Sequence, residues 1–186
     1  MEKINIFAFA GSLRKDSYNK ALLRAAAELL PENTELEIFD LEGIPLFNQD
    51  NESQPLAKVK EFKAKIKAAD AILIATPEYN YSIPGVLKNA IDCASRPYGD
   101  NSFDDKPLAI MGASIGNIAT SRAQYHLRQS CVFLNMHPLN IPEVMVGAIQ
   151  EKIDNNSRLK DEKTREFIKS MLVNLVAMTK QLKNRR

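Results

Sequence analysis

Three short runs of almost uninterrupted apolar residues constrain the fold of this chain more than any other feature. They cover residues 4–10 (INIFAFA), 71–76 (AILIAT) and 108–113 (LAIMGA). A strand with one face in water alternates apolar and polar side chains, whereas a strand covered on both faces is apolar throughout. The runs therefore predict a parallel β-sheet whose two faces are both covered.

Segments of helical periodicity separate these runs. In residues 18–30, Ala21, Leu22 and Ala25 recur at helical spacing, and Pro31 ends the pattern. Further strands are expected at residues 36–39 and, interrupted by proline, around Leu139. Helices are expected at residues 18–30, 56–66, 84–95, 120–134 and 164–182. The alternation predicts an α/β fold with a five-stranded parallel sheet and helices on both faces.

Length and composition limit the classes of protein to consider. The 186 residues predict a single domain spanning residues 1–186, since domains of ~100–150 residues are common. A net charge of +2 gives no reason to expect nucleic acid or a membrane surface as partner. No apolar run reaches the ~18–20 residues of a membrane span. A cytoplasmic protein is expected.

The two cysteines do not form a metal or redox motif. Cys93 and Cys131 are not part of a CxxC pair, and no histidine cluster with zinc-like spacing accompanies them. Both lie in apolar helical patterns, which predicts buried free thiols. No metal site is expected.

Three polar segments follow the apolar runs. They are GSLRKDSYN (residues 11–19), TPEYNYSIPG (76–85) and GASIGNIATSR (112–122). Right-handed crossovers place the carboxyl ends of parallel strands at one edge of the sheet. Ligands bind at this edge in open α/β sheets. The three segments are therefore expected to form one crevice.

The first segment has the chemistry of a phosphate site. Hydrogen-bond donors come from the side chains of Ser12, Ser17 and Asn19, and Arg14 adds a guanidinium. The helix expected to begin near Ser17 adds backbone N–H groups that have no partner within the helix. This set suits a phosphate monoester dianion. Alternatively, Ser17 only caps the helix and Arg14 is solvated. The segment matches neither GxxxxGK[ST] nor GxGxxG, which argues against a P-loop and against a tightly bound dinucleotide.

The second and third segments suit a planar ligand. Residues 76–85 contain two tyrosines, Tyr79 and Tyr81, and two prolines that stiffen the backbone. Fixed backbone N–H groups and ring faces would bind a heteroaromatic ring with donors and acceptors along one edge, although a surface turn explains the same residues. In the third segment Ser114 is a hydrogen-bond donor and Gly112 and Gly116 permit close approach.

Together GSLRKDSYNKALL, TPEYNYSIPGVLKNAIDCASRP and GASIGNIATSRAQYHLRQ resemble the NADPH-dependent FMN reductase family, which includes bacterial quinone and chromate reductases and related azoreductases. The resemblance covers residues 4–146 and implies a flavodoxin-like fold that binds FMN. It implies phosphate contacts from Ser12, Arg14, Ser17 and Asn19, with Tyr18 adjacent. It places Pro77, Glu78, Tyr79 and Asn80 along the isoalloxazine, partly through backbone groups, and Ser114 near the flavin.

The resemblance also implies the activity of an FMN-dependent NAD(P)H oxidoreductase. Such an enzyme reduces quinones, azo compounds, metal oxyanions such as chromate, or free flavin. Hydride transfer through bound FMN would be ping-pong, with a small-molecule acceptor and no catalytic acid or base among the side chains. A homodimer or homotetramer is expected, with the apolar residues 83–91 as a candidate contact. The chain departs from the family pattern at Cys93, Ile115, Asn117 and Ala119.

Two other classes stay open at this point. A flavodoxin-type electron carrier would share the fold, but such carriers resemble one another in strong acidity, and this chain is slightly basic. A flavin-free regulatory or scaffold domain is the other alternative. The residues do not identify the physiological electron acceptor. The sequence contains no recognisable motif for the 2′-phosphate that distinguishes NADPH from NADH.

Overall fold

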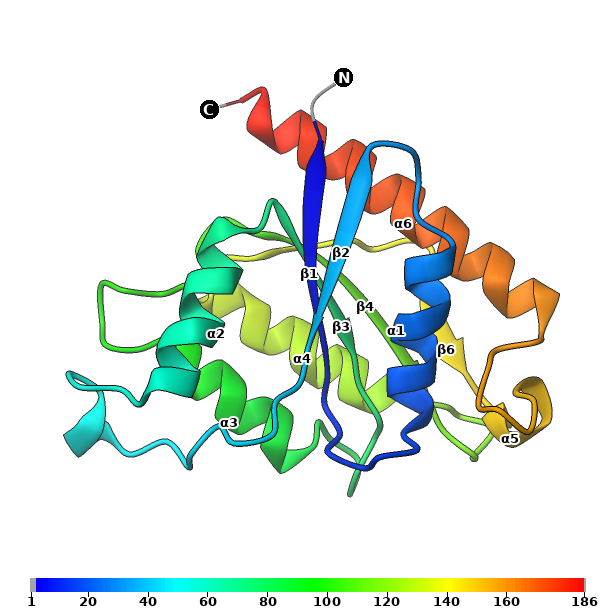
Figure 1. The fold of residues 1–186 in the computed structure, drawn as a ribbon, viewed down its shortest axis with the longest axis horizontal. Helices are drawn as coiled ribbons and strands as arrows, with labels where there is room; N and C mark the ends of the chain where they lie inside the picture. The colour runs from blue at the N-terminus through cyan, green and yellow to red at the C-terminus, as the bar shows by residue number, and fades with distance from the viewer. Residues whose placement is uncertain (1–2, 186) are drawn as a thin grey trace.

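The computed structural model describes residues 3–185, and residues 1, 2 and 186 of the expected domain lie outside them. One parallel sheet runs through the molecule (Figure 1), with strand order β2-β1-β3-β4-β5 and with β6 also paired to β4. The strands are β1 (Ile4–Ala10), β2 (Thr34–Phe39), β3 (Ala71–Ala75), β4 (Pro107–Ala113), β5 (His137–Pro138) and β6 (Val144–Val146). This 2-1-3-4-5 order is the flavodoxin order, so the expected fold is confirmed.

Helices cover both faces of the sheet. They are α1 (Tyr18–Glu28), α2 (Ala57–Ala68), α3 (Gly85–Ala94), α4 (Ser121–Phe133), α5 (Ile149–Lys152) and α6 (Glu162–Lys183), with a 3-10 helix at Gln49–Asn51. The sequence pattern did not indicate α5 or the 3-10 helix, which are too short to show a helical period. Among the described residues, no helix combines the length and apolar character needed to cross a membrane.

Side chains of β1 point alternately into two separate cores. Ile6 and Ala8 pack with α1 and α6 on one face, whereas Phe7 and Phe9 pack with α2 and α3 on the other. The rings of Phe9 and Phe62 meet edge to face, with centroids 5.1 Å apart. Both faces of the strand are thus buried, which explains its continuous apolar sequence.

The fifth position of the sheet differs from the expectation. Instead of one strand around Leu139, β5 pairs with the start of β4 and β6 pairs with its end. Pro138 and Pro142 interrupt this edge, and proline has no N–H to donate to a neighbouring strand. The edge strand is therefore split into two short pieces.

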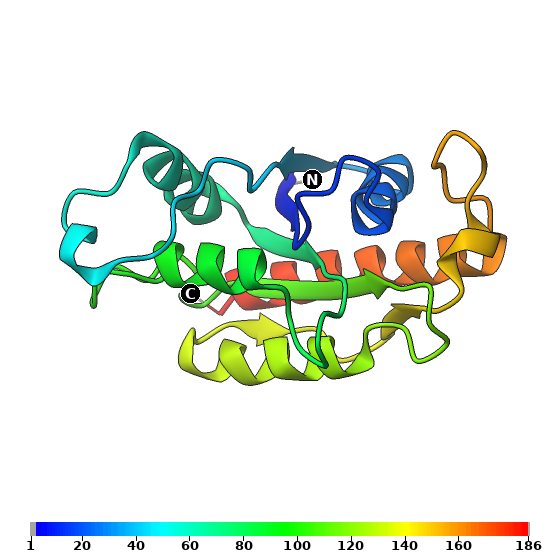
Figure 2. The same cartoon turned by 90° about the horizontal axis from the view of Figure 1, so that it is seen from below.

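The strand order reverses between β1 and β3, because β2 lies outside β1 and β4 lies beyond β3. The backbone N–H of Gly11 donates to the carbonyl of Ala75 at 2.8 Å, and that of Thr76 donates to Met111 at 2.9 Å. The ends of β1, β3 and β4 are therefore adjacent. Figure 2 views the molecule from this carboxyl edge.

Candidate functional site

The three polar segments leave the sheet from three adjacent strands, as expected. Residues 11–17 follow β1, residues 76–84 follow β3 and residues 114–120 follow β4. The backbone N–H of Ser114 also donates to the carbonyl of Val146 at 3.0 Å, which anchors the third segment beside β6. The carboxyl edge thus brings together segments from distant parts of the sequence.

The first segment builds a small polar cup at the start of α1. Ser17 is the N-cap residue, and its hydroxyl accepts a hydrogen bond from the backbone N–H of Lys20 at 3.5 Å. Ser12 and Ser17 are both buried. The first backbone N–H groups of a helix have no partner within it and carry the positive end of its dipole. The helix start and the two hydroxyls form a donor set for an anion.

The guanidinium of Arg14 is held beside this cup. One N–H of Arg14 donates to the carbonyl of Asp16, and the guanidinium carbon lies 4.7 Å from the centroid of the Tyr18 ring. Arginine has five N–H donors, so donors remain for a ligand. The contact with Tyr18 orients the charge toward the start of α1.

The side chain of Asn19, expected to contact a phosphate, is hydrogen-bonded to the backbone of β4 instead. It is 2% exposed, its Nδ2 donates to the carbonyl of Ala113 at 3.2 Å, and its Oδ1 accepts from the N–H of Ala113 at 2.9 Å. The side chain therefore joins α1 to the end of β4. What Asn19 presents at the cup is its backbone N–H, in the first turn of α1.

The second segment contains a tight reverse turn. Tyr79 and Ser82 exchange two backbone hydrogen bonds, of 3.0 and 2.9 Å. The central residues have positive φ, 49° at Asn80 and 66° at Tyr81, which is typical of a type I′ turn. Just before the turn, the Thr76 hydroxyl donates to the carbonyl of Pro77 at 2.8 Å. This turn fixes the backbone that carries two exposed tyrosine rings, Tyr79 and Tyr81.

The side chain of Glu78 binds α4. Its Oε1 forms an ion pair with Arg122, and its Oε2 accepts from the backbone N–H of Ala123 at 3.1 Å. The guanidinium of Arg122 in turn lies over the ring of Tyr81, 3.7 Å from its centroid. The sequence indicates Tyr81 only as one of two aromatic rings in the second segment. Arg122 is not among the expected site residues, and its only sequence signal is its position at the end of the third segment.

A groove of about 460 Å³ separates the second segment from the third. Ser114 lines it, and its hydroxyl accepts from the N–H of Gly116 at 3.1 Å. Ala119 has a φ of 58°, which glycine adopts more easily; this position is one of the departures from the family pattern. The groove is lined by Glu78, Asn80, Tyr81, Ser114, Gly116, Asn117, Ile118, Ala119 and Arg122.

The donor set fits the two ends of a flavin mononucleotide. Hydroxyls, a guanidinium and a helix N-terminus suit a phosphate dianion, and the backbone groups of the proline-stiffened second segment suit the edge of a planar ring. The family model described as NADPH-dependent FMN reductase matches residues 4–151. The chain belongs to this family.

Relatives of this reductase match it along nearly its full length. An NAD(P)H-dependent FMN reductase of Pseudomonas aeruginosa is 49% identical over 183 residues, 98% of each chain. A 2-hydroxy-1,4-benzoquinone reductase of a Burkholderia species is 43% identical over 169 residues, 91% of this chain and 92% of the relative. The solved structure of a flavoenzyme NAD(P)H:(acceptor) oxidoreductase from Paracoccus denitrificans has a TM-score of 0.88, with 33% identity, and covers 96% of this chain and 98% of its own.

The chain is therefore an FMN-dependent oxidoreductase with NAD(P)H as electron donor, and the expected family, enzyme class and cofactors are confirmed. The electron-carrier and scaffold alternatives have no support among these relatives, which are named as reductases. When bound, FMN supplies the hydride-accepting and hydride-donating chemistry. The protein's own groups bind the cofactor, orient the substrates and shield the site from water.

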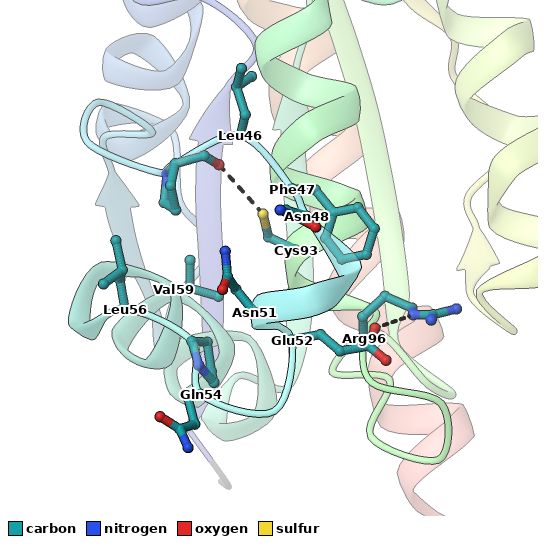
Figure 3. Close-up of a pocket in the computed structure, with 12 residues that line it drawn as sticks. Leu46, Phe47, Asn48, Asn51, Glu52, Gln54, Leu56, Val59, Cys93 and Arg96 are labelled. Carbon is teal, nitrogen blue, oxygen red and sulfur yellow. Dashed lines mark hydrogen bonds and ion pairs between the residues drawn. The ribbon is translucent and has the colours of Figure 1, made fainter.

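The reductase has a second cavity, of about 270 Å³, between the segment after β2 and helix α3 (Figure 3). Asn89 holds one wall, because its amide binds Phe47 N–H and Pro45 C=O, both at 2.8 Å. The thiol of Cys93 also donates to Pro45 C=O, at 3.6 Å. The lining residues come from residues 45–59 and from Cys93 and Arg96, not from the three polar segments.

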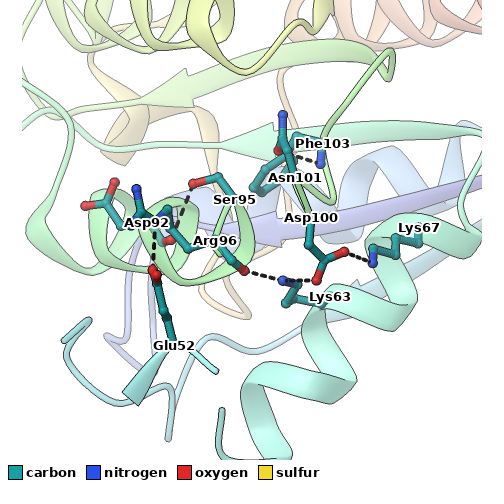
Figure 4. A network of polar contacts seen from close by, with 9 residues as sticks. All are labelled: Glu52, Lys63, Lys67, Asp92, Ser95, Arg96, Asp100, Asn101 and Phe103. Carbon is teal, nitrogen blue, oxygen red and sulfur yellow. Dashed lines mark hydrogen bonds and ion pairs between the residues drawn. The ribbon is translucent and has the colours of Figure 1, made fainter. Parts of the chain in front are cut away.

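Ion pairs fix the chain around this cavity (Figure 4). Arg96 Nε donates to Glu52 Oε2 at 2.8 Å, and Lys63 Nζ donates to Asp100 Oδ2 at 2.7 Å. These contacts tie the turn after α3 to the 3-10 segment and to α2. They stabilise a wall of the molecule and do not reach the groove residues.

Both cysteines are free and buried, which confirms the expectation for them. Burial raises the pKa of the Cys93 thiol, and burial raises the pKa of Cys131 to about 11. Thiols with raised pKa values are poor nucleophiles near neutral pH, because the thiolate is the reactive form. Both side chains serve in packing.

Proposed function

We propose that this reductase transfers electrons from NAD(P)H to a quinone through FMN bound at the carboxyl edge of the sheet. The observation that carries the proposal is the shared position of the polar cup at α1 and of the groove between the second and third segments, because all three segments leave adjacent strands at one edge of the sheet. Quinones rank ahead of azo compounds, chromate and free flavin because the Burkholderia relative is named for a benzoquinone. Free FMN ranks second, after the name of the Pseudomonas relative.

Each expected site residue has a proposed role. Ser12, Arg14 and Ser17 bind the phosphate with their side chains. Tyr18 and Asn19 bind it through backbone N–H groups of the first helical turn, because the side chain of Asn19 is engaged with Ala113. Backbone groups of Pro77, Glu78, Tyr79 and Asn80 line the ring, and Ser114 donates to it from the third segment.

We further propose that the chain acts as one flavodoxin-like domain of residues 1–186 in the cytoplasm. All described strands belong to one sheet and its faces carry all the long helices, which supports one folding unit. Two free cysteines are typical of proteins kept in a reducing compartment.

Steady-state kinetics test the proposed function. Because one groove has to receive first the nicotinamide and then the quinone, the first product leaves before the second substrate binds. Varying NADPH at several fixed quinone concentrations is expected to give parallel double-reciprocal lines. Intersecting lines, together with a measured ternary complex, would contradict a shared site.

A homodimer or homotetramer remains part of the proposal, but several apolar side chains of residues 83–91 are unavailable for its contact surface. Leu87, Ala90 and Ile91 are buried in the chain's own core, because α3 turns its apolar face to the sheet. Large apolar side chains are exposed instead on α4, at Tyr125, Val132 and Phe133. A helix face of this kind is typical of a protein interface.

Light scattering of the FMN-loaded protein is expected to give about two or four times the 20.9 kDa of one chain. Phe133→Glu is expected to lower that mass, because it places a charge on the exposed apolar face. A fully active wild-type protein with the mass of one chain would contradict the assembly proposal.

A further inference from the structure

Helix α4 is capped by a side chain from another part of the chain. The hydroxyl of its N-cap residue, Thr120, accepts instead from Nε2 of Gln124 at 3.0 Å. The cap comes from Glu78, whose Oε2 accepts from the backbone N–H of Ala123 at 3.1 Å. Ala123 is the third residue of α4, where the side chain of an N-cap residue normally bonds. Glu78 thus caps α4 from 45 residues away in the sequence, a role that the N-cap residue itself usually has.

The other carboxylate oxygen of Glu78 pairs with Arg122, in the same helical turn. The Glu78 side chain is only 6% exposed and that of Arg122 is 34% exposed. A buried carboxylate is stable only when its charge is compensated and its oxygens accept hydrogen bonds. Both compensating groups belong to α4, so the carboxylate fastens the second polar segment to this helix.

The ion pair also determines how Arg122 lies. Its guanidinium covers the ring of Tyr81, at 3.7 Å from the centroid. Tyr81 is 68% exposed and follows Asn80 in the tight turn. The ring and the guanidinium both line the groove between the second and third segments. Without Glu78, the long side chain of Arg122 regains its rotamer freedom, and the ring loses a fixed neighbour.

We propose that the Glu78 carboxylate is a positioning residue for the reductase reaction. It holds the guanidinium of Arg122 over the ring of Tyr81 and thereby fixes one wall of the groove that receives the nicotinamide and the quinone. This inference rests on the proposed function for the use of the groove. The role belongs to the carboxylate, whereas the cofactor contact proposed above belongs to the backbone of Glu78.

Two substitutions separate the cap from the charge. Glu78→Gln keeps a carbonyl oxygen that can accept from Ala123 N–H but removes the charge that holds Arg122. Glu78→Ala removes both. Amide hydrogen exchange on the FMN-loaded proteins is expected to show wild-type protection at Ala123 in Glu78→Gln and about tenfold faster exchange in Glu78→Ala. This readout does not depend on activity.

Kinetics at saturating FMN test the wall itself. Glu78→Gln is expected to raise KM for both menadione and NADPH about tenfold, with kcat within about threefold, because a loosened wall weakens substrate binding. Arg122→Lys, which keeps the charge but loses the planar stack on Tyr81, is expected to give the same pattern. The double variant is expected to be no worse than the worse single variant, because both changes break one unit.

Glu28→Gln is the matched control. Glu28 pairs with Arg165 at 3.0 Å on the exposed side of α1 and α6, outside the groove, and its loss is expected to leave both KM values unchanged. Unchanged KM values in Glu78→Gln would overturn the inference. An equal rise in the FMN dissociation constant would also overturn it, because the carboxylate would then be a cofactor ligand. If the wild-type protein reduced no quinone, the proposed function would fail instead, so the two failures are distinct.

Discussion

Replacement of Arg14 by alanine is expected to weaken FMN binding about tenfold to a hundredfold, because charge-assisted hydrogen bonds contribute roughly 1.5–3 kcal/mol. The guanidinium lies beside the start of α1, held by the carbonyl of Asp16 and the ring of Tyr18. Its loss leaves the helix N-terminus and two serine hydroxyls to bind a dianion. Titration of the apoprotein with FMN, followed by quenching of flavin fluorescence, measures the effect.

Riboflavin is the control ligand, since it keeps the ring and lacks the phosphate. Arg14→Ala is expected to leave riboflavin affinity nearly unchanged, and equal losses for both ligands would assign Arg14 to the fold or the ring site. Ser17→Ala is expected to weaken FMN binding by roughly 0.5–2 kcal/mol. Part of that cost is lost capping, because the Ser17 hydroxyl also accepts from Lys20 N–H.

Gly112→Ala is expected to destabilise the protein by about 3 kcal/mol, near the upper end of overpacking costs. A Cβ at this position would lie 2.2 Å from the Thr120 hydroxyl and 2.4 Å from the backbone carbonyl of Thr76. The carbonyl belongs to the main chain after β3, so relief requires the strand ends to separate. The melting temperature of the apoprotein is expected to fall by about 6–12 °C.

Gly85→Ala provides the matched control for this change. A Cβ at Gly85 would meet no described atom within 4 Å, and the residue begins α3. Its melting temperature is expected to stay the same or to rise slightly, because alanine restricts the unfolded chain. Equal melting temperatures for the two variants would show that the ends of β3 and β4 can move apart easily.

The chain's local patterns predicted most of the architecture. Continuous apolar runs such as residues 71–76 occur because β3 is covered on both faces, and the helical periods follow from one buried face per helix. The sequence predicts a single proline-interrupted edge strand around Leu139, because its prolines show where pairing stops but not where it resumes. Residues 83–91 were assigned to an interface because an apolar stretch does not reveal what covers it.

Local sequence patterns are enough to predict the fold class, the convergence of three polar segments at one edge of the sheet, and the phosphate site proposed at Ser12, Arg14 and Ser17. These features depend on short-range order, namely strand and helix periodicity and the chemistry of one continuous loop. The contacts of individual polar side chains depend instead on tertiary packing. Asn19 binds Ala113, 94 residues away, and Glu78 caps α4, 45 residues away. A buried polar group takes whichever partner the packed elements bring to it, and no local pattern encodes that partner.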